Sequence, residues 1–322
     1  MTALTRDTFS ETLRTKGMES FFEKYDTFPV QYNMIVEKET IDGAYEIKTS
    51  IVDAAIPQER EDGQTTHRAN MGEGFPVMMR KRFIGDVLEI TKGTKQDVAI
   101  DLVKRFSTRA SRGAIMAKNT MVANLFNNGF YTAGKPCYNN TVPNAMSDTS
   151  GNLVYDGYPF FNLTGNKRSS KGGGTYYNGE TGVTLTSTTL ASAIASMTTR
   201  NNKAENDTDI DLIPDILVTG PGAIAQAAKV ILESEWIPET GNNAINIMRQ
   251  ALKLVVLNGI TDTDFWAIGC SKSGIWAYDG GDPVFDSWYD ADKGIYFYKY
   301  ELEFSCGVKN WRYWYGFNGT TA

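Results

Sequence analysis

The chain has 322 residues, of which 41% are hydrophobic and 22% are charged, as in globular proteins that bury sizeable cores. This length favours about two cores of ~150 residues each. Because 38 acidic residues outnumber 32 basic ones and the net charge is −6, a protein that grips nucleic acid by neutralising phosphates is disfavoured.

The first 36 residues are mixed and amphipathic, with apolar side chains at Phe9, Leu13, Met18, Phe21 and Phe22. We expect a short helix followed by an extended segment, which together form an arm without a core of its own. The segment has no apolar centre of signal-peptide length, and no stretch of the chain approaches the ~20 apolar residues that span a bilayer. We therefore expect a chain that is not exported and that has no membrane partner.

A strand with period two follows, in which apolar residues 45, 47 and 51 and Thr49 alternate with polar ones. A matching apolar segment returns over residues 75–90, and the 18 residues between them, 57–74, are almost wholly polar. A two-stranded hairpin with so long a loop is marginal in water unless it lies on something else. We interpret residues 37–92 as an extended loop whose packing partner is another molecule.

The clearest helix is predicted over residues 94–127. Thr94 and Asp97 resemble a capping box at its start, and Asn127-Asn128-Gly129 is a typical stop. At 1.5 Å per residue it would run roughly 50 Å. One narrow stripe of the helix is apolar, and basic residues occupy the remaining circumference. The stripe is Ala99, Val103, Phe106, Ala110, Ala117 and Met121, and the basic residues are Lys104, Arg105, Arg109, Arg112 and Lys118. This pattern is typical of a strut that lies along a thin sheet.

The remainder of the chain predicts a mixed α/β region. Residues 130–185 are rich in Gly, Asn, Tyr and Ser and indicate loops with short strands. Helices are expected at 184–200 and 223–234, and strands at 215–220, 252–257, 265–270, 274–278 and in the aromatic run 294–317.

Gly220-Pro221-Gly222-Ala223-Ile224-Ala225 matches the GxGxxA fingerprint of a dinucleotide-binding turn, placed after a strand and before a helix. The motif lies two thirds of the way along the chain instead of in a first βαβ unit. No convincing βαβαβ half follows it, and no acidic residue ends a strand ~20 residues further on, as dinucleotide binding requires. We favour a strand-to-helix turn with proline at the helix start. A nicotinamide-dependent oxidoreductase stays open as an alternative, to be tested by dinucleotide binding in Gly222→Val.

Other candidate sites are weaker. Asp207, Asp209 and Asp211 begin like a calcium loop but lack its glycine and bidentate acid, which favours a solvated acidic linker. Lys167, Arg168 and Lys171 beside three glycines lack the order of a phosphate loop, which favours a surface loop.

Side chains that carry common catalysis are scarce. The single histidine, His67, stands in the polar loop, and Cys137, Cys270 and Cys306 form no metal-ligand spacing. The carboxylate pairs Asp290/Asp292 and Glu233/Glu235 are general acid/base candidates, although solvated surface is the commoner role. The C-terminal aromatics Trp311, Tyr313, Trp314 and Tyr315 favour core packing over stacking on sugars or bases. A carbohydrate-binding or fibre-like phage protein is a further alternative.

The order of the predicted elements, together with several short sequence segments, resembles that of the major capsid proteins of tailed double-stranded-DNA bacteriophages. These proteins have a Hong Kong 97-like fold, and the resemblance is in particular to Mu-type major head proteins. The segments that carry the resemblance are YEIKTSIVDAAIPQEREDG, FIGDVLEITKGTKQDVAIDLVKRFSTRASRGAIMAKNTMVANLFNNGF, PFFNLTGN, LIPDILVTGPGAIAQAAKVILES, FWAIGC and GVKNWRYWYGF. Residues 165–182 depart from the family's pattern.

The resemblance implies an α+β fold with an N-terminal arm (1–36), an extended loop (37–92), a peripheral domain with the spine helix (93–134), an axial domain (135–284) and C-terminal strands (285–322). It also implies hexamers and pentamers of this chain that form an icosahedral head around phage DNA. No cofactor or active site is implied. A separate scaffolding protein, a portal, a possible decoration protein and non-specific proximity to packaged DNA are the expected partners, with assembly in the host bacterial cytoplasm.

For assembly we expect the polar loop to extend over a neighbouring subunit. The candidate contact residues are Glu59, Arg60, Glu61 and Asp62 in the loop, Arg105, Arg109 and Arg112 on the spine helix, and Phe21 and Phe22 in the arm. Exposed ion pairs contribute at most ~1 kcal/mol each, so geometry and repetition would have to stabilise the shell.

Overall fold

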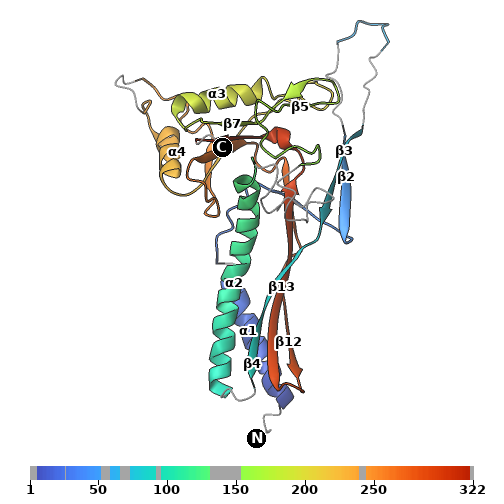
Figure 1. Cartoon of the computed structure of the whole chain (residues 1–322), viewed down its shortest axis with the longest axis vertical. Coiled ribbons are helices and arrows are strands. Elements are labelled where there is room, and N and C mark those ends of the chain that lie inside the picture. Colours follow the sequence, from blue (N-terminus) through green and yellow to red (C-terminus); the bar gives the residue numbers. More distant parts are fainter. Residues whose placement is uncertain are drawn as a thin grey trace. The chain divides into compact units, whose positions relative to one another are not determined.

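The computed structural model describes residues 6–25, 27–51, 59–65, 73–91, 96–130, 154–238 and 244–319 (Figure 1). His67, Cys137 and the helix cap at Thr94 lie outside these residues. The chain divides into two compact units. Unit 1 comprises residues Met1–Val30, Lys81–Asn119 and Tyr278–Ser305, and unit 2 comprises Gln31–Arg80, Thr120–Ala277 and Cys306–Ala322.

In unit 1 an antiparallel sheet is built around one long strand. Strand β13 (Ile295–Val308) pairs with β12 (Val284–Asp290) on one side and with β4 (Phe83–Thr91) on the other. Phe285 lies opposite Tyr300 in this register, and both side chains are buried. The alternation of apolar and polar residues in the aromatic run therefore places one face of the sheet in a core.

Two helices cover that face. The ring of Phe21 in α1 (Arg6–Tyr25) lies 5.7 Å from the ring of Tyr300, and the ring of Phe106 in α2 (Gln96–Asn127) lies 6.0 Å from the same tyrosine. The two helices are close together, because a Cβ at Gly17 would stand 3.0 Å from Val103. The expected helix in the N-terminal arm is confirmed, and it packs on its own chain.

The long helix is confirmed and has 32 residues, which corresponds to about 48 Å. Between residues 103 and 123 its buried positions follow a narrow stripe of mostly small residues, and the larger Leu125 and Phe126 are buried at its C-terminal end. The stripe is Val103, Ser107, Ala110, Ser111, Ala114, Ile115, Lys118, Val122 and Ala123. Phe106, Ala117 and Met121 of the predicted stripe are half-buried. The small side chains let α2 lie close to the elements it packs against.

The prediction that Lys118 belongs to the basic outer face of α2 is wrong. Its side chain is 2% exposed, and its ammonium group donates to Asp279 Oδ1 and to the Tyr25 hydroxyl, each at 2.8 Å. Burial opposes the charged form of Lys118, but these two partners outweigh it and raise its pKa. Four residues after Ala114, Lys118 falls on the buried stripe, so helical spacing alone could have placed it there.

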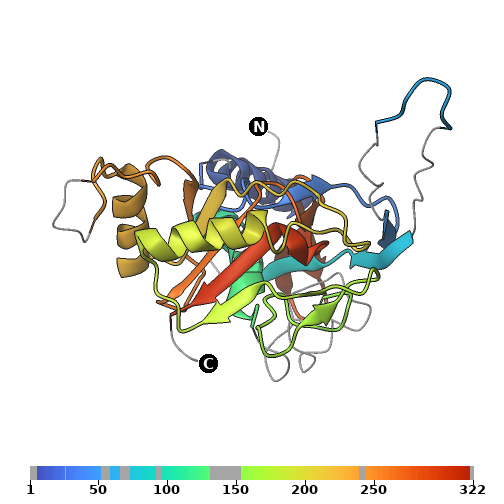
Figure 2. The same ribbon diagram turned by 90° about the horizontal axis from the view of Figure 1, so that it is seen from above.

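Unit 2 contains a five-stranded sheet with the order β7, β14, β10, β8, β9 (Figure 2). The neighbours β14–β10 and β10–β8 are antiparallel, whereas β8–β9 and β14–β7 are parallel. The strands are β7 (Gly179–Thr181), β8 (Ile216–Thr219), β9 (Lys253–Val256), β10 (Phe265–Gly269) and β14 (Trp314–Asn318). The strands and helices expected in this region are confirmed.

Both faces of this sheet are covered. Helices α3 (Ser187–Thr198) and α4 (Ala223–Glu233) pack on one face through a cluster that includes Trp266 and Phe317, whose rings stack 4.0 Å apart. On the opposite face the ring of Phe126 contacts the rings of Phe265 and Trp314. Double coverage explains why β8 and β10 read as continuous apolar runs.

The glycine turn at 220–222 joins β8 to α4, and α4 leads to the parallel strand β9. Gly222 has φ = +107°, which favours glycine, and it caps the helix without a side-chain hydrogen bond. The other neighbour of β8 is the antiparallel strand β10, and β9 is at the edge of the sheet. The sheet thus contains one parallel β-α-β unit at its edge, whereas dinucleotide-binding domains have a doubly wound, mostly parallel sheet. The turn is therefore a strand-to-helix connection, as the sequence indicated.

The extended hairpin consists of β2 (Tyr45–Ile51) and β3 (Glu73–Arg80). The expected return segment, 75–90, is split: residues up to Arg80 pair with β2, whereas β4 pairs with β13. Lys81 and Arg82 separate β3 from β4, and at these two residues the chain changes from pairing with β2 to pairing with β13.

Several shorter elements complete unit 2. They are β1 (Glu37–Glu39), β5 (Arg168–Ser169), β6 (Thr175–Tyr176), the start of β11 (Ile275–Asp279) and the 3-10 helix η1 (Trp311–Tyr313). None of the helices in the described ranges is long and apolar enough to cross a membrane. The described His, Cys, Asp and Glu residues include no group placed to hold a metal ion.

Lys118→Ala should lower the free energy of unfolding by about 3–5 kcal/mol, because it leaves the half-buried Asp279 carboxylate without its ammonium partner. Urea denaturation of the purified chain measures this change. The matched control is Lys104→Ala on the exposed face of the same helix, which should change the unfolding free energy by no more than about 0.5 kcal/mol. Equal effects of the two variants would contradict the assignment.

Candidate functional site

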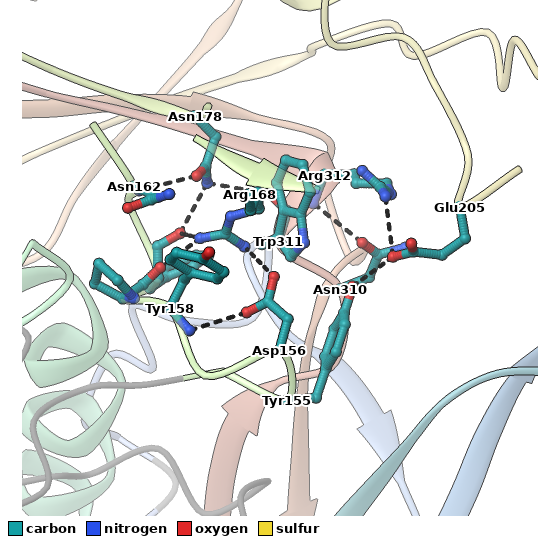
Figure 3. A network of polar contacts seen from close by, with 12 residues as sticks. Tyr155, Asp156, Tyr158, Asn162, Arg168, Asn178, Glu205, Asn310, Trp311 and Arg312 are labelled. Carbon is teal, nitrogen blue, oxygen red and sulfur yellow. Dashed lines mark hydrogen bonds and ion pairs between the residues drawn. The ribbon is translucent and has the colours of Figure 1, made fainter. Parts of the chain in front are cut away.

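A buried polar network organises unit 2 around Trp311 (Figure 3). The guanidinium groups of Arg168 and Arg312 both stack on the Trp311 ring, at 4.1 and 4.3 Å from its centroid. Arg168 is 1% exposed, Arg312 is 3% exposed and Trp311 is 2% exposed. Two fully buried arginines are unusual, and each needs an acid to offset its desolvation.

Each arginine has such a partner. Arg168 Nη1 lies 3.2 Å from Asp156 Oδ2, and Arg312 Nη2 lies 2.9 Å from Glu205 Oε1. Burial lowers the pKa of Arg168 to about 10 despite the neighbouring Asp156, which leaves it charged at neutral pH. Burial also raises the pKa of Asp156 above its ordinary value, although Arg168 opposes that shift.

Asparagine side chains extend the network to the sheet. Asn178 Nδ2 donates to the carbonyl oxygens of Phe160 at 2.8 Å and Trp314 at 3.1 Å, and Asn178 Oδ1 accepts from the Asn162 amide at 3.0 Å. Asn310 Oδ1 accepts from the Arg312 amide at 3.1 Å and caps η1. These contacts join loop, strand and helix segments far apart in sequence, which is a structural role.

The interpretation of Lys167, Arg168 and Lys171 as one surface loop is wrong for Arg168. Lys167 and Lys171 are exposed, whereas the side chain of Arg168 between them is buried in the core. The signal that could have placed it is pairing with an acid at long range, and a single sequence does not reveal such pairs. Trp311, Trp314 and Tyr315 are buried, so their predicted role in core packing is confirmed.

The interpretation of residues 207–211 as a solvated linker is wrong for Asp207. Its carboxylate accepts hydrogen bonds from Ser170 Oγ at 2.5 Å, Tyr176 Oη at 2.8 Å and the Gly174 amide at 2.9 Å. Burial alone would raise the pKa of Asp207, but these three donors outweigh it and hold the pKa below its ordinary value. These hydrogen bonds stabilise the glycine-rich turn in a conformation that surrounds the Asp207 carboxylate.

The candidate acid/base pairs form local contacts. Asp290 Oδ1 accepts from the amides of Asp292 and Lys293 in the turn after β12, and Glu235 pairs with Arg249 at 3.3 Å. Glu233 stands 4.0 Å from Lys229 on the exposed side of α4. These are arrangements of exposed turns and helix surfaces, not of a shared catalytic centre.

The loop residues Glu59, Arg60, Glu61 and Asp62 are all exposed. Arg60 Nη1 donates to the Gln64 carbonyl at 3.0 Å, and the Gln64 amide donates to the Glu61 carbonyl at 3.2 Å, around Gly63 with φ = +85°. Within the described part of the loop, these two hydrogen bonds form a turn, and the residues that carry the three carboxylates are exposed.

On α2 the residues Arg105, Arg109 and Arg112 are exposed, as is Lys104. Arg105 pairs with Asp101 one turn earlier at 2.9 Å. Of the arm residues, Phe22 is half-buried, but Phe21 is 1% exposed. The expectation that Phe21 supplies a contact between subunits is corrected, because its ring is part of the core of unit 1.

The two faces of hairpin β2–β3 differ. Val77 and Met79 are buried, and Lys48 contacts both Glu39 and the ring of Trp276. Burial alone would raise the pKa of Glu39, but Lys48 and Lys309 outweigh it and lower the pKa. On the opposite face Tyr45 is 58% exposed and Ile47 is 55% exposed. Ile47 lies opposite Met78 in the register, so an apolar stripe crosses both strands.

No protein-family model matches the chain, and no curated protein matches it significantly. Solved structures do match it in fold. The capsid of an empty GTA particle has a TM-score of 0.51 and 9% identity over 91% of this chain and 90% of that one. The capsid of the cyanophage P-SCSP1u has a TM-score of 0.51 and 11% identity over 90% and 88% of the two chains. The chain therefore has the α+β, Hong Kong 97-like capsid fold that the sequence resemblance predicts.

Asp207→Asn should remove part of the acid sensitivity of unit 2. Because the pKa of Asp207 is lower in the folded than in the unfolded chain, its stabilising effect is complete above the unfolded pKa and is lost as pH falls through the folded pKa. Urea midpoints measured from pH 6 down to about pH 3 should therefore fall less steeply in Asp207→Asn. Asp209→Asn, at an exposed ion pair with Lys203, is the control and should keep the wild-type slope.

Proposed function

We propose that this chain is the major capsid protein of a tailed double-stranded-DNA bacteriophage, a structural subunit without enzymatic activity. The observation that carries the proposal is the shared fold with capsid structures over about nine tenths of both chains. The order of arm, hairpin, long helix and doubly covered sheet supports it. In this proposal copies of the chain form the hexamers and pentamers of an icosahedral head, and the chain is located in the virion.

The proposed domain roles follow the two units. Unit 1 with the spine helix α2 corresponds to the peripheral domain, and the sheet of unit 2 with α3 and α4 corresponds to the axial domain. Hairpin β2–β3 is the extended loop, and residues 1–36 are the arm. Scaffolding protein, portal and decoration protein would be separate chains assembled with it in the host cytoplasm, and the acidic net charge suits a shell that encloses DNA without holding it tightly.

The contact that we propose between neighbouring copies is electrostatic and apolar at once. The exposed carboxylates of Glu59, Glu61 and Asp62 would meet the exposed guanidinium groups of Arg105, Arg109 and Arg112 on the next copy. The apolar stripe of Tyr45 and Ile47 would be covered in the same contact, with Phe22 of the arm adding apolar surface elsewhere. Each ion pair contributes at most about 1 kcal/mol, so the shell depends on many such contacts.

Deleting residues 58–73 should give a folded chain that does not form shells. The free energy of unfolding should change by less than about 1 kcal/mol, because residues 59–65 of the deleted segment are exposed and, among its described residues, only Glu73 belongs to a strand. Circular dichroism and urea denaturation test the fold, and negative-stain electron microscopy tests the assembly. Normal particles from the deletion variant would contradict the role of the loop.

Reversing two charges on the helix, Arg109→Glu with Arg112→Glu, should weaken each contact by about 1–2 kcal/mol and suppress particle formation. Adding Glu59→Arg and Glu61→Arg in the same chain should restore particles, since the charge pattern is then exchanged. The control pair Lys229→Glu with Lys253→Glu changes the net charge equally on another exposed surface. Loss of particles in the control, or no rescue in the exchanged variant, would contradict this pairing.

A further inference from the structure

The loop end of hairpin β2–β3 contacts two residues from other segments of unit 2. The ring of Phe75 in β3 stacks on the ring of Tyr155, with centroids 5.2 Å apart and planes at 29°. The ammonium group of Lys171 lies 4.9 Å from the centroid of the same Phe75 ring and donates to the carbonyl oxygen of Gly74 at 3.1 Å. Two side chains from outside the hairpin therefore hold one aromatic residue near the point where the loop joins β3.

Lys171 is positioned by the glycine-rich turn between β5 and β6. The Gly172 amide donates to the Glu205 carbonyl at 2.9 Å, and Gly173 has φ = +97°, which favours glycine. A Cβ at Gly172 or Gly174 would overlap the Asp207 carboxylate that the turn surrounds. The three consecutive glycines thus have a specific use: they let the turn close on Asp207 and present Lys171 to the hairpin.

Tyr155 is positioned by the buried network. Its hydroxyl donates to Glu205 Oε1 at 3.3 Å, and the same oxygen of Glu205 lies 2.9 Å from Arg312, which stacks on Trp311. The contacts of Phe75 therefore extend, through Tyr155, into the buried network around Trp311. By contrast, Lys171 is exposed and its contacts with Phe75 and Gly74 are of a kind that is individually weak.

We propose that Lys171, Phe75 and Tyr155 form a clamp that sets the direction of hairpin β2–β3 relative to the body of unit 2. The proposal rests on the proposed function, in which this hairpin lies over a neighbouring copy. Phe75 stands two residues after the start of β3, so the clamp fixes the end of the paired strands from which the polar loop departs. The clamp therefore controls whether Glu59, Glu61 and Asp62 meet the next copy, and its exposed half, Lys171, is the part that can open.

The test uses the full-length chain and the variant Lys171→Met, which keeps the length of the side chain and removes its charge. Hydrogen exchange of the backbone amides in β2 and β3 should become roughly five- to tenfold faster before assembly, while exchange in β8 and β10 stays unchanged. The yield of closed particles should fall at an unchanged urea midpoint. Phe75→Leu should act in the same way.

The matched control is Lys167→Met, which removes an exposed lysine from the same segment without touching the hairpin. Hairpin exchange that is unchanged in Lys171→Met and Phe75→Leu would overturn the clamp. Faster exchange with a normal yield of closed particles would overturn its control of assembly. If the wild-type chain forms no particles while the variants still speed exchange as expected, the clamp stands and the proposed function fails.

Discussion

The stacking of two buried arginines on Trp311 is the interaction on which unit 2 most depends. Removing water from a guanidinium group is costly, and the cost is offset only where an acid and an aromatic face are both in place. Arg168 needs Asp156, Arg312 needs Glu205, and both need the Trp311 ring. Because these residues come from four separate segments, the network can form only when those segments have their final arrangement.

The network also connects the interior to the surface that we propose for assembly. Glu205 contacts both Arg312 and Tyr155, and Tyr155 stacks on Phe75 near the loop end of the extended hairpin. Asp207, two residues on, folds the glycine-rich turn that carries Lys171. A buried network and a loop end that is held by individually weak contacts suit the shell subunit that we propose, which must stay folded alone and still adjust to its neighbours.

Unit 1 follows a simpler constraint, which is the narrow buried stripe of α2. Small residues such as Ala110, Ser111 and Ala114 let a 32-residue helix lie close to a thin sheet and to α1. The opposite side of the helix keeps its arginines in solvent. Lys118 is a charged residue on this stripe, and the cost of burying its charge is offset by its contacts with Asp279 and Tyr25.

The sequence by itself determined the elements and their order, since alternation in β2 and helical spacing in α2 are local properties of the chain. It also determined which face of α2 is mainly basic and which is apolar, and several short segments of the sequence indicated the capsid fold. Only the tertiary structure decided the role of Arg168, Asp207 and Phe21, the partners of Lys118, and which strand pairs with the second half of residues 75–90. The physical reason is that burial of a charge and pairing of a strand depend on partners that stand tens to hundreds of residues away, and local spacing carries no information about them.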